Sequence, residues 1–173
     1  MKRWQSAVAA VSMLAGSLLA GAAEAAPVKL ALFRFELDDF SAAASSTGET
    51  PADAAQLERV TDDIRKLLAE SGRYELVDVA AADAPTAKTH TLQSCNGCEA
   101  ALALQLGADQ SLVGVVKRIS RTEYQVRYQL RDASTGAVIS EADTGLRMGT
   151  LDSWGRGAKR LVKDRLLASP AQP

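Results

Sequence analysis

Short runs of alternating hydrophobic and polar residues dominate the second half of the chain. Between Leu106 and Gly145 three strand-like runs follow one another. Residues 111–116 are apolar on both faces, which is typical of an interior strand. In residues 124–131 apolar and polar side chains alternate, which predicts an antiparallel strand with one solvated face. The segment Asp132–Gly136 predicts a turn that joins this strand to a third, over residues 137–143.

The first half of the chain has the pattern of a strand, a helix and a second strand. Residues 28–36 are rich in apolar and aromatic side chains and predict a largely buried strand. The segment Thr50–Asp53 predicts a helix start, with a capping Thr, a Pro at the first position and an acid in the first turn. Gly72 is placed to end this helix, and a strand follows over residues 73–79. The apolar helix positions are Leu57, Val60, Ile64, Leu67 and Leu68.

Two long loops separate these elements from the rest. We expect residues 37–50, which include the adjacent carboxylates of Asp38 and Asp39, to form a solvated loop. Residues 80–94 are expected to form a second loop, which contains the single histidine of the chain, His90. These two loops are therefore the places where we expect a binding surface.

Two further helices are predicted. Asn96 and Glu99 have the spacing of a capping box, which would begin a short Ala/Leu-rich helix that ends at Gly107. Asp152 is placed to cap a final helix. The apolar residues of that helix recur at helical spacing: Trp154, Ala158, Leu161, Val162 and Leu166.

The element order is strand, helix, strand, helix, three strands and a helix. The first strand–helix–strand unit predicts a right-handed crossover with parallel pairing. We therefore expect a single α/β domain with a mixed sheet of about five strands and helices packed on it. On its solvated face, Arg127, Gln129 and Arg131 are expected to pair across the hairpin with Glu141 and Asp143.

The start of the chain has the features of an export signal. Met1–Arg3 is basic, residues 7–20 are apolar and uncharged, and Ala23–Ala25 places small residues where a signal peptidase cleaves. We expect residues 1–25 to be removed as a signal peptide. No lipid-attachment cysteine follows, and no later apolar run is long enough to cross a membrane. The sequence thus predicts a periplasmic protein without a transmembrane segment after cleavage.

The remaining chain is predicted to be one domain over residues 26–168, followed by a disordered tail over residues 169–173. The full chain has 20 basic and 21 acidic residues, with a formal net charge of −1. Nucleic-acid binding would require a basic excess, so we expect no nucleic-acid partner.

Three segments carry a resemblance to a known group of proteins. Ser71–Asp78 reads SGRYELVD, Leu106–Val116 reads LGADQSLVGVV, and Leu130–Ser140 reads LRDASTGAVIS. Together they resemble exported bacterial proteins of uncharacterised families. They are also similar to the periplasmic domain of the curli-secretion pore protein and to the N-terminal domain of the Tol–Pal propeller protein. The resemblance covers residues 28–167, and it implies a non-enzymatic binding or assembly part of the cell envelope.

The motif Cys95-Asn-Gly-Cys98 is the sharpest chemical feature. Covalent haem attachment requires His after the second Cys, and Glu99 stands there instead. Three alternatives remain. The pair could be a structural disulfide, an exchangeable redox pair, or a copper or zinc site that also uses His90. Apart from such a metal, the sequence predicts no cofactor.

The final helix has a group of basic residues: Arg156, Lys159, Arg160 and Lys163. They form either a face for an anionic partner or the solvated side of a packed helix. The sequence thus supports two hypotheses of different classes. The first is a non-enzymatic envelope module that binds a protein or a small ligand. The second is a protein that handles thiols or metals through Cys95 and Cys98.

Overall fold

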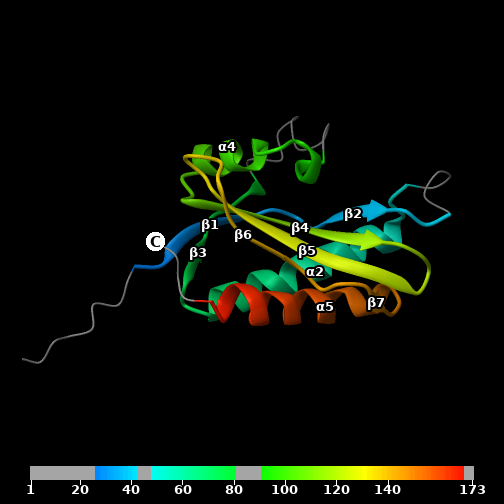
Figure 1. The fold of residues 1–173 in the computed structure, drawn as a ribbon. Coiled ribbons are helices and arrows are strands. Elements are labelled where there is room, and N and C mark those ends of the chain that lie inside the picture. Colours follow the sequence, from blue (N-terminus) through cyan, green and yellow to red (C-terminus); the bar gives the residue numbers. More distant parts are fainter. Residues whose placement is uncertain (1–25, 43–47, 81–90, 170–173) are drawn as a thin grey trace, which may run out of the picture.

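The computed structural model describes residues 26–42, 48–80 and 91–169, and Figure 1 shows their arrangement. The strands are β1 (Val28–Leu32), β2 (Glu36–Asp39), β3 (Tyr74–Leu76), β4 (Gln110–Arg118), β5 (Glu123–Asp132), β6 (Val138–Asp143) and β7 (Arg147–Met148). The helices are α2 (Pro51–Glu70), α4 (Cys98–Gln105) and α5 (Trp154–Leu161), which continues into the π-helical η4 (Val162–Leu167). Two 3-10 turns, η2 (Leu92–Ser94) and η3 (Leu151–Ser153), precede α4 and α5.

All seven strands form one mixed sheet in the order β3-β1-β4-β5-β6, while β2 pairs with β4 and β7 pairs with β5. Strands β1 and β3 are parallel, as the predicted crossover requires, and β4, β5 and β6 form an antiparallel meander. The prediction of a single α/β domain with a mixed sheet and helices packed on it is confirmed. The two strands beyond the expected five are the short β2 and β7.

The first predicted strand is interrupted. β1 ends at Leu32 and β2 begins at Glu36, yet both run parallel to β4, which is long enough to pair with both. At the interruption the N–H of Phe35 donates to the Thr61 hydroxyl on α2, at 2.9 Å, instead of to a strand. Strand β2 extends to Asp39, so the predicted loop over residues 37–50 is wrong at its first three positions.

The helix α2 begins as predicted. The Asp53 N–H donates to the Thr50 hydroxyl at 3.2 Å, and the Thr50 N–H donates to the Asp53 carboxylate at 3.0 Å. These reciprocal bonds satisfy N–H groups that the first turn of a helix leaves unpaired. Gly72 follows the helix with φ of +67°, a conformation that glycine adopts without steric cost.

The predicted caps of the other two helices are wrong. α4 begins at Cys98, after Gly97 with φ of +109°, so Asn96 is not the cap. The Glu99 carboxylate instead accepts the Gly97 N–H at 3.1 Å. Asp152 lies inside the turn η3, and no side-chain cap precedes α5, because this 3-10 turn continues directly into the helix.

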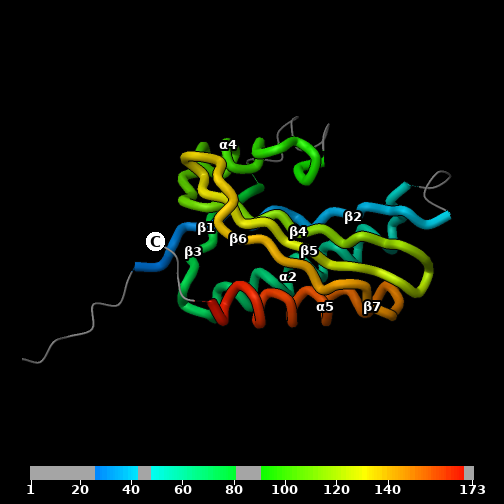
Figure 2. The backbone as a smooth tube through the Cα atoms, in the orientation of Figure 1, coloured from blue at the N-terminus to red at the C-terminus, as the bar shows by residue number. Residues whose placement is uncertain are grey.

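The sheet separates two apolar clusters (Figures 1 and 2). Helices α2 and α5 pack side by side on one face, and α4 with η2 covers part of the other. The predicted apolar residues Trp154, Ala158, Leu161, Val162 and Leu166 are all buried in the larger cluster. In the described part of the chain, no helix is long and apolar enough to cross a membrane.

Candidate binding groove

Strand β6 ends the sheet, and its outer edge is unpaired in the described part of the chain. The Thr144 N–H donates to the carbonyl of Val126 on β5 at 2.9 Å. Since backbone groups alternate in direction along a strand, Ala142 also faces β5, whereas the N–H and C=O groups of Glu141 and Asp143 face outward. Among the described residues, no backbone hydrogen bond reaches these outward groups. An edge of this kind can accept another strand.

A groove runs between this edge and the helical segment α5–η4. It consists of three adjoining hollows, and Arg165 lines all of them. Ser140 and Ser169 line both the hollow next to Arg73 and the middle hollow. Asp143 and Thr144 line both the middle hollow and the third hollow, which lies next to Arg160. We call these three hollows the β6 groove.

The charge in the β6 groove comes from arginine side chains and from carboxylates, which include Glu141 on β6 as well as Asp143. Asp143 accepts hydrogen bonds from the Gly145 N–H at 2.6 Å and from the Gln125 amide at 2.9 Å, and these bonds lower its pKa. Its charge is therefore already stabilised by neighbouring groups. Arg147 and Arg165 are exposed and have no side-chain hydrogen bond within the described residues. The groove thus offers cationic groups to an incoming chain.

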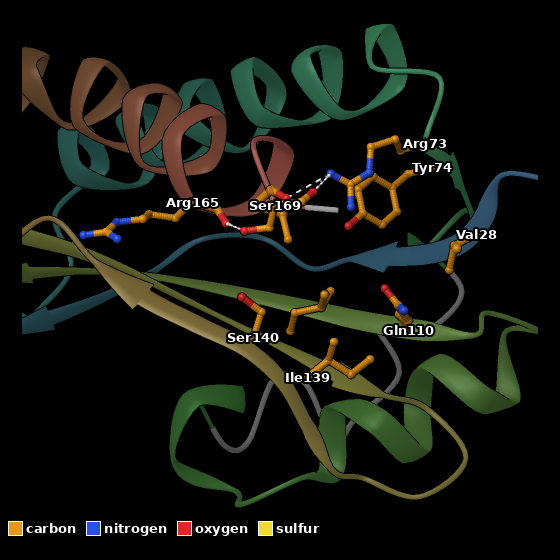
Figure 3. A pocket seen from close by; sticks show the side chains of 10 residues that line it. Val28, Arg73, Tyr74, Gln110, Ile139, Ser140, Arg165 and Ser169 are labelled. Atoms are coloured by element: carbon orange, nitrogen blue, oxygen red, sulfur yellow. Dashed lines mark hydrogen bonds between the residues drawn. The ribbon is translucent and has the colours of Figure 1, made fainter. Parts of the chain in front are cut away.

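Arg73 lies at one end of the groove and binds the C-terminal end of η4. Its Nη1 donates to the carbonyls of Leu166 at 3.0 Å, Leu167 at 3.0 Å and Ser169 at 2.8 Å. These carbonyls belong to the helix terminus, where backbone acceptors lack partners within the helix. Figure 3 shows Arg73 reaching the end of η4 beside Tyr74 on β3. This contact holds the helical wall of the groove against the start of the sheet.

The two cysteines are joined in a disulfide that precedes and begins α4. Cys95, Cys98 and the buried Glu99 bring their sulfur and carboxylate atoms within 4.8 Å of one another. A zinc or copper ion would require the thiolate form of both cysteines, which the disulfide removes. His90 lies outside the described residues, so its predicted part in a metal site remains a prediction. The motif lies on the opposite face of the sheet from the helical wall of the β6 groove (Figure 1).

The cross-strand pairs predicted for Arg127, Gln129 and Arg131 of β5 form only in part. The Gln129 amide donates to Glu141 across the hairpin at 2.9 Å, as predicted. Arg131 instead forms an ion pair with the buried Glu99 at 2.8 Å. This contact satisfies a carboxylate that the α4 packing removes from water. Arg127 remains exposed.

The four basic residues predicted on the last helix do not share one environment. Lys159 pairs with Asp63 of α2 at 3.0 Å, and Arg160 pairs with Asp164 at 3.3 Å. Arg156 donates to the Ser153 hydroxyl at 3.0 Å, and Lys163 is exposed. Of the four, Arg160 lines the β6 groove.

Sequence reasoning missed a buried ion cluster at the other end of the sheet. The prediction that Asp38 and Asp39 lie in a solvated loop is wrong for Asp39, whose side chain is 10% exposed and bonds to Arg118. Arg118 also bonds to Asp53 on α2, at 2.7 Å. The hydrogen bond from Arg118 lowers the pKa of Asp39 to about 2. The cluster ties β2, β4 and α2 together, and the only local signal of it was the acid in the first turn of the helix.

The two loops expected to form the binding surface are described only in part, at residues 37–42, 48–50, 80 and 91–94. Within these segments, Glu36 at the start of β2 accepts the N–H groups of Leu92 at 2.6 Å and Gln93 at 3.0 Å. Burial raises the pKa of Glu36. The second loop is thus tied to β2 at its C-terminal end, and binding through these loops remains a prediction.

None of the curated proteins matches the sequence. Among solved structures, the chain is similar to the LpoB C-terminal domain from Salmonella enterica, with 19% identity over 73% of this chain and 87% of that chain, and a TM-score of 0.49. It is similar to PelC from Paraburkholderia phytofirmans, crystallised as a dodecamer, with 20% identity over 87% and 93% and a TM-score of 0.46. It is also similar to TolB from Acinetobacter baumannii, with 18% identity over 86% and 30% and a TM-score of 0.40. At these values the similarities assign no function.

The family comparison is more direct. A family model matches residues 28–166, which include every strand and the helices α2, α4 and α5. The chain belongs to the DUF3280 family, described as "Protein of unknown function (DUF2380)".

Proposed function

We propose that this protein is an exported, non-enzymatic module of the cell envelope that binds an extended segment of another protein in the β6 groove. The observation that carries the proposal is the unpaired outer edge of β6 beside a groove. Export is supported by the basic, apolar and small-residue pattern of residues 1–25. The function is that of a scaffold that captures a strand.

An extended peptide suits this site better than a compact ligand. Main-chain groups of an added strand would bond to the outward groups of Glu141 and Asp143, which gives affinity without requiring a particular sequence. The opposite wall, formed by α5–η4, would contact alternate side chains of that strand. The groove consists of three adjoining hollows, so an extended segment can contact residues in each of them.

The charged side chains of the β6 groove favour one class of peptide over another. Arg147 and Arg165 are exposed at the groove and form no side-chain hydrogen bond within the described residues. The carboxylates of Asp143 and Glu141, in contrast, already accept hydrogen bonds from neighbouring side chains. A segment with a carboxylate that reaches these arginines is therefore favoured over a basic one. Because the arginines are exposed to solvent, binding should weaken as the salt concentration rises.

The test uses one position and two substitutions. Glu141→Pro removes the outward N–H, whereas Glu141→Ala keeps it and removes the same side-chain bond to Gln129. A displayed library of random heptapeptides is selected on the wild-type protein, and the affinities of the enriched peptides are then measured for all three proteins. We expect Glu141→Pro to weaken binding about tenfold or more and Glu141→Ala to have little effect.

A proline on an edge strand with its missing N–H toward solvent is compatible with the fold. Circular dichroism and thermal unfolding check this for Glu141→Pro. A second variant, Arg165→Gln, leaves the backbone unchanged and should reduce both affinity and its salt dependence. The proposal is overturned if no peptide is enriched, or if the enriched peptides bind Glu141→Pro as well as Glu141→Ala.

A further inference from the structure

A small cavity of about 80 Å³ lies at the Arg73 end of the β6 groove, between η4 and the sheet (Figure 3). Its apolar wall includes Val28, Leu130, Ile139 and Leu166. The volume exceeds what a single water molecule needs but is too small for a typical drug-sized ligand. The cavity therefore has the size of one side chain of a bound segment.

Two buried polar groups at this cavity have no partner within the described residues. Gln110 is 6% exposed, and its Oε1 makes no hydrogen bond. The Nε of Arg73 is likewise buried and unbonded, although Nη1 of the same side chain bonds to the helix terminus. Buried polar atoms without partners are uncommon and destabilising, so a group that satisfies both atoms would bind favourably.

The surrounding groups limit what that partner is. Figure 3 shows the side chains of Tyr74, Gln110 and Ser140 directed toward the same space. Burial raises the pKa of Tyr74, so its hydroxyl keeps its proton at neutral pH and remains a donor. The positive charges of Arg73 and Arg165 at the cavity oppose a cation.

We infer that the cavity binds a primary carboxamide, the side chain of Asn or Gln in the segment that the β6 groove holds. The carboxamide N–H donates to the Gln110 amide, and its carbonyl accepts from Nε of Arg73. In the orientation of the Gln110 amide that the structure gives, a carboxylate has no donor for Oε1, and an apolar group leaves both buried atoms unpartnered. A carboxamide pairs with the Gln110 amide in either orientation of that amide, whereas a carboxylate pairs with it only when the amide is reversed. That the carboxamide belongs to a bound protein segment rests on the proposed function. The preference of the cavity for a carboxamide does not depend on it.

The test uses small molecules and needs no peptide. Propionamide, propionate and butanone have nearly the same shape, and they differ in donors and charge. Each is titrated against the isotope-labelled full chain, with the amide resonances of Gln110 and Ile139 as readout. We expect propionamide to bind in the millimolar range and about tenfold more tightly than the other two, because only it supplies both a donor and an acceptor.

Gln110→Leu is the matched variant. It keeps the side-chain size and removes the unpartnered amide, a change that is neutral or stabilising for a buried polar group. The preference for propionamide should disappear in this variant while the fold is retained. Equal binding of the three probes, or no saturable shift because only water occupies the cavity, would overturn the inference.

The outcomes separate this inference from the proposed function. If enriched heptapeptides depend on the β6 edge but propionamide does not bind, the cavity inference fails and the proposed function stands. If propionamide binds and no peptide does, the proposed function fails and the cavity remains a carboxamide site. If Asn or Gln is enriched at one position of the selected peptides, and Gln110→Leu abolishes this enrichment, the cavity inference and the proposed function are both supported.

Discussion

Nη1 of Arg118 lies 2.7 Å from Oδ1 of Asp53, which joins the end of β4 to the first turn of α2. The same guanidinium bonds to Asp39 on β2, and the two carboxylates are only 4% and 10% exposed. Arg118→Met would leave two buried carboxylates without their cation. We expect the free energy of unfolding to fall by about 3–5 kcal/mol, measured by urea denaturation.

Arg160→Met is the control for this substitution. Arg160 also pairs with an aspartate, Asp164 at 3.3 Å, but its side chain is 77% exposed. An exposed pair of this kind contributes about 0–1 kcal/mol, so this variant should unfold almost like the wild type. If the two variants lose similar stability, the Arg118 cluster does not have the structural role assigned to it.

The same cluster predicts how stability depends on pH. Hydrogen bonding from Arg118 lowers the pKa of Asp39 to about 2. Burial alone would raise the pKa of Asp53, but bonds from Arg118 and Thr50 outweigh it and the pKa is lowered. Because the folded pKa values lie below those of the unfolded chain, this stabilisation is complete above about pH 4 and is lost as the pH falls toward about 2.

Denaturation curves between neutral pH and pH 2 measure this loss. The contribution of Asp132 to the pH dependence must be distinguished from that of the Arg118 cluster, because hydrogen bonds from Ser134 and Thr135 also lower the pKa of Asp132 to about 2. The background is therefore Asp132→Asn, with and without Arg118→Met. We expect the decline in stability below about pH 4 to be smaller in the variant that lacks Arg118. An unchanged decline would contradict the assignment.

The disulfide between Cys95 and Cys98 is expected to stabilise the fold without contributing to binding in the β6 groove. It closes a very short loop, so Cys95→Ser with Cys98→Ser should lower the free energy of unfolding by about 2 kcal/mol. Peptide and propionamide binding should not change, because α4 and α5 lie on opposite faces of the sheet.

The thiol state of the purified protein tests the alternative function. Intact mass after alkylation, with and without reductant, should show a fully oxidised pair that lacks bound metal. A reduced, easily exchanged or metal-loaded pair would instead favour the thiol or metal hypothesis, with Cys95 and Cys98 as the site.

Gly114 and Phe35 predict a packing effect in the core. A Cβ atom at Gly114 would lie 2.2 Å from Cζ of Phe35, which is far inside contact distance. Gly114→Ala should destabilise the protein by about 1–3 kcal/mol or more, because the buried ring has to move. Phe35→Leu provides the space, so the double variant should lose less stability than the sum of the two single variants. Additive losses would show that the ring is not the obstacle.

The sequence by itself was sufficient to predict the elements that depend on local periodicity. The helix start at Thr50, its end at Gly72, the β5–β6 hairpin and the buried face of the last helix all follow from residues close together in the chain. The parallel pairing of β1 and β3 also follows, because a helix connects them. The same reasoning failed at the caps near Asn96 and Asp152, where glycine or a preceding turn begins the helix.

Only the tertiary structure decided the rest. Arg118 and Asp39 are 79 positions apart, and the cavity beside Gln110 forms only because η4 packs against the sheet. Alternation along β6 predicts which side chains share a face, but it does not predict that β6 ends the sheet. Strand order, and therefore the free edge and the groove, depends on which strands meet after the chain has folded. Sequence patterns describe short-range geometry, whereas this candidate site is built from contacts between distant segments.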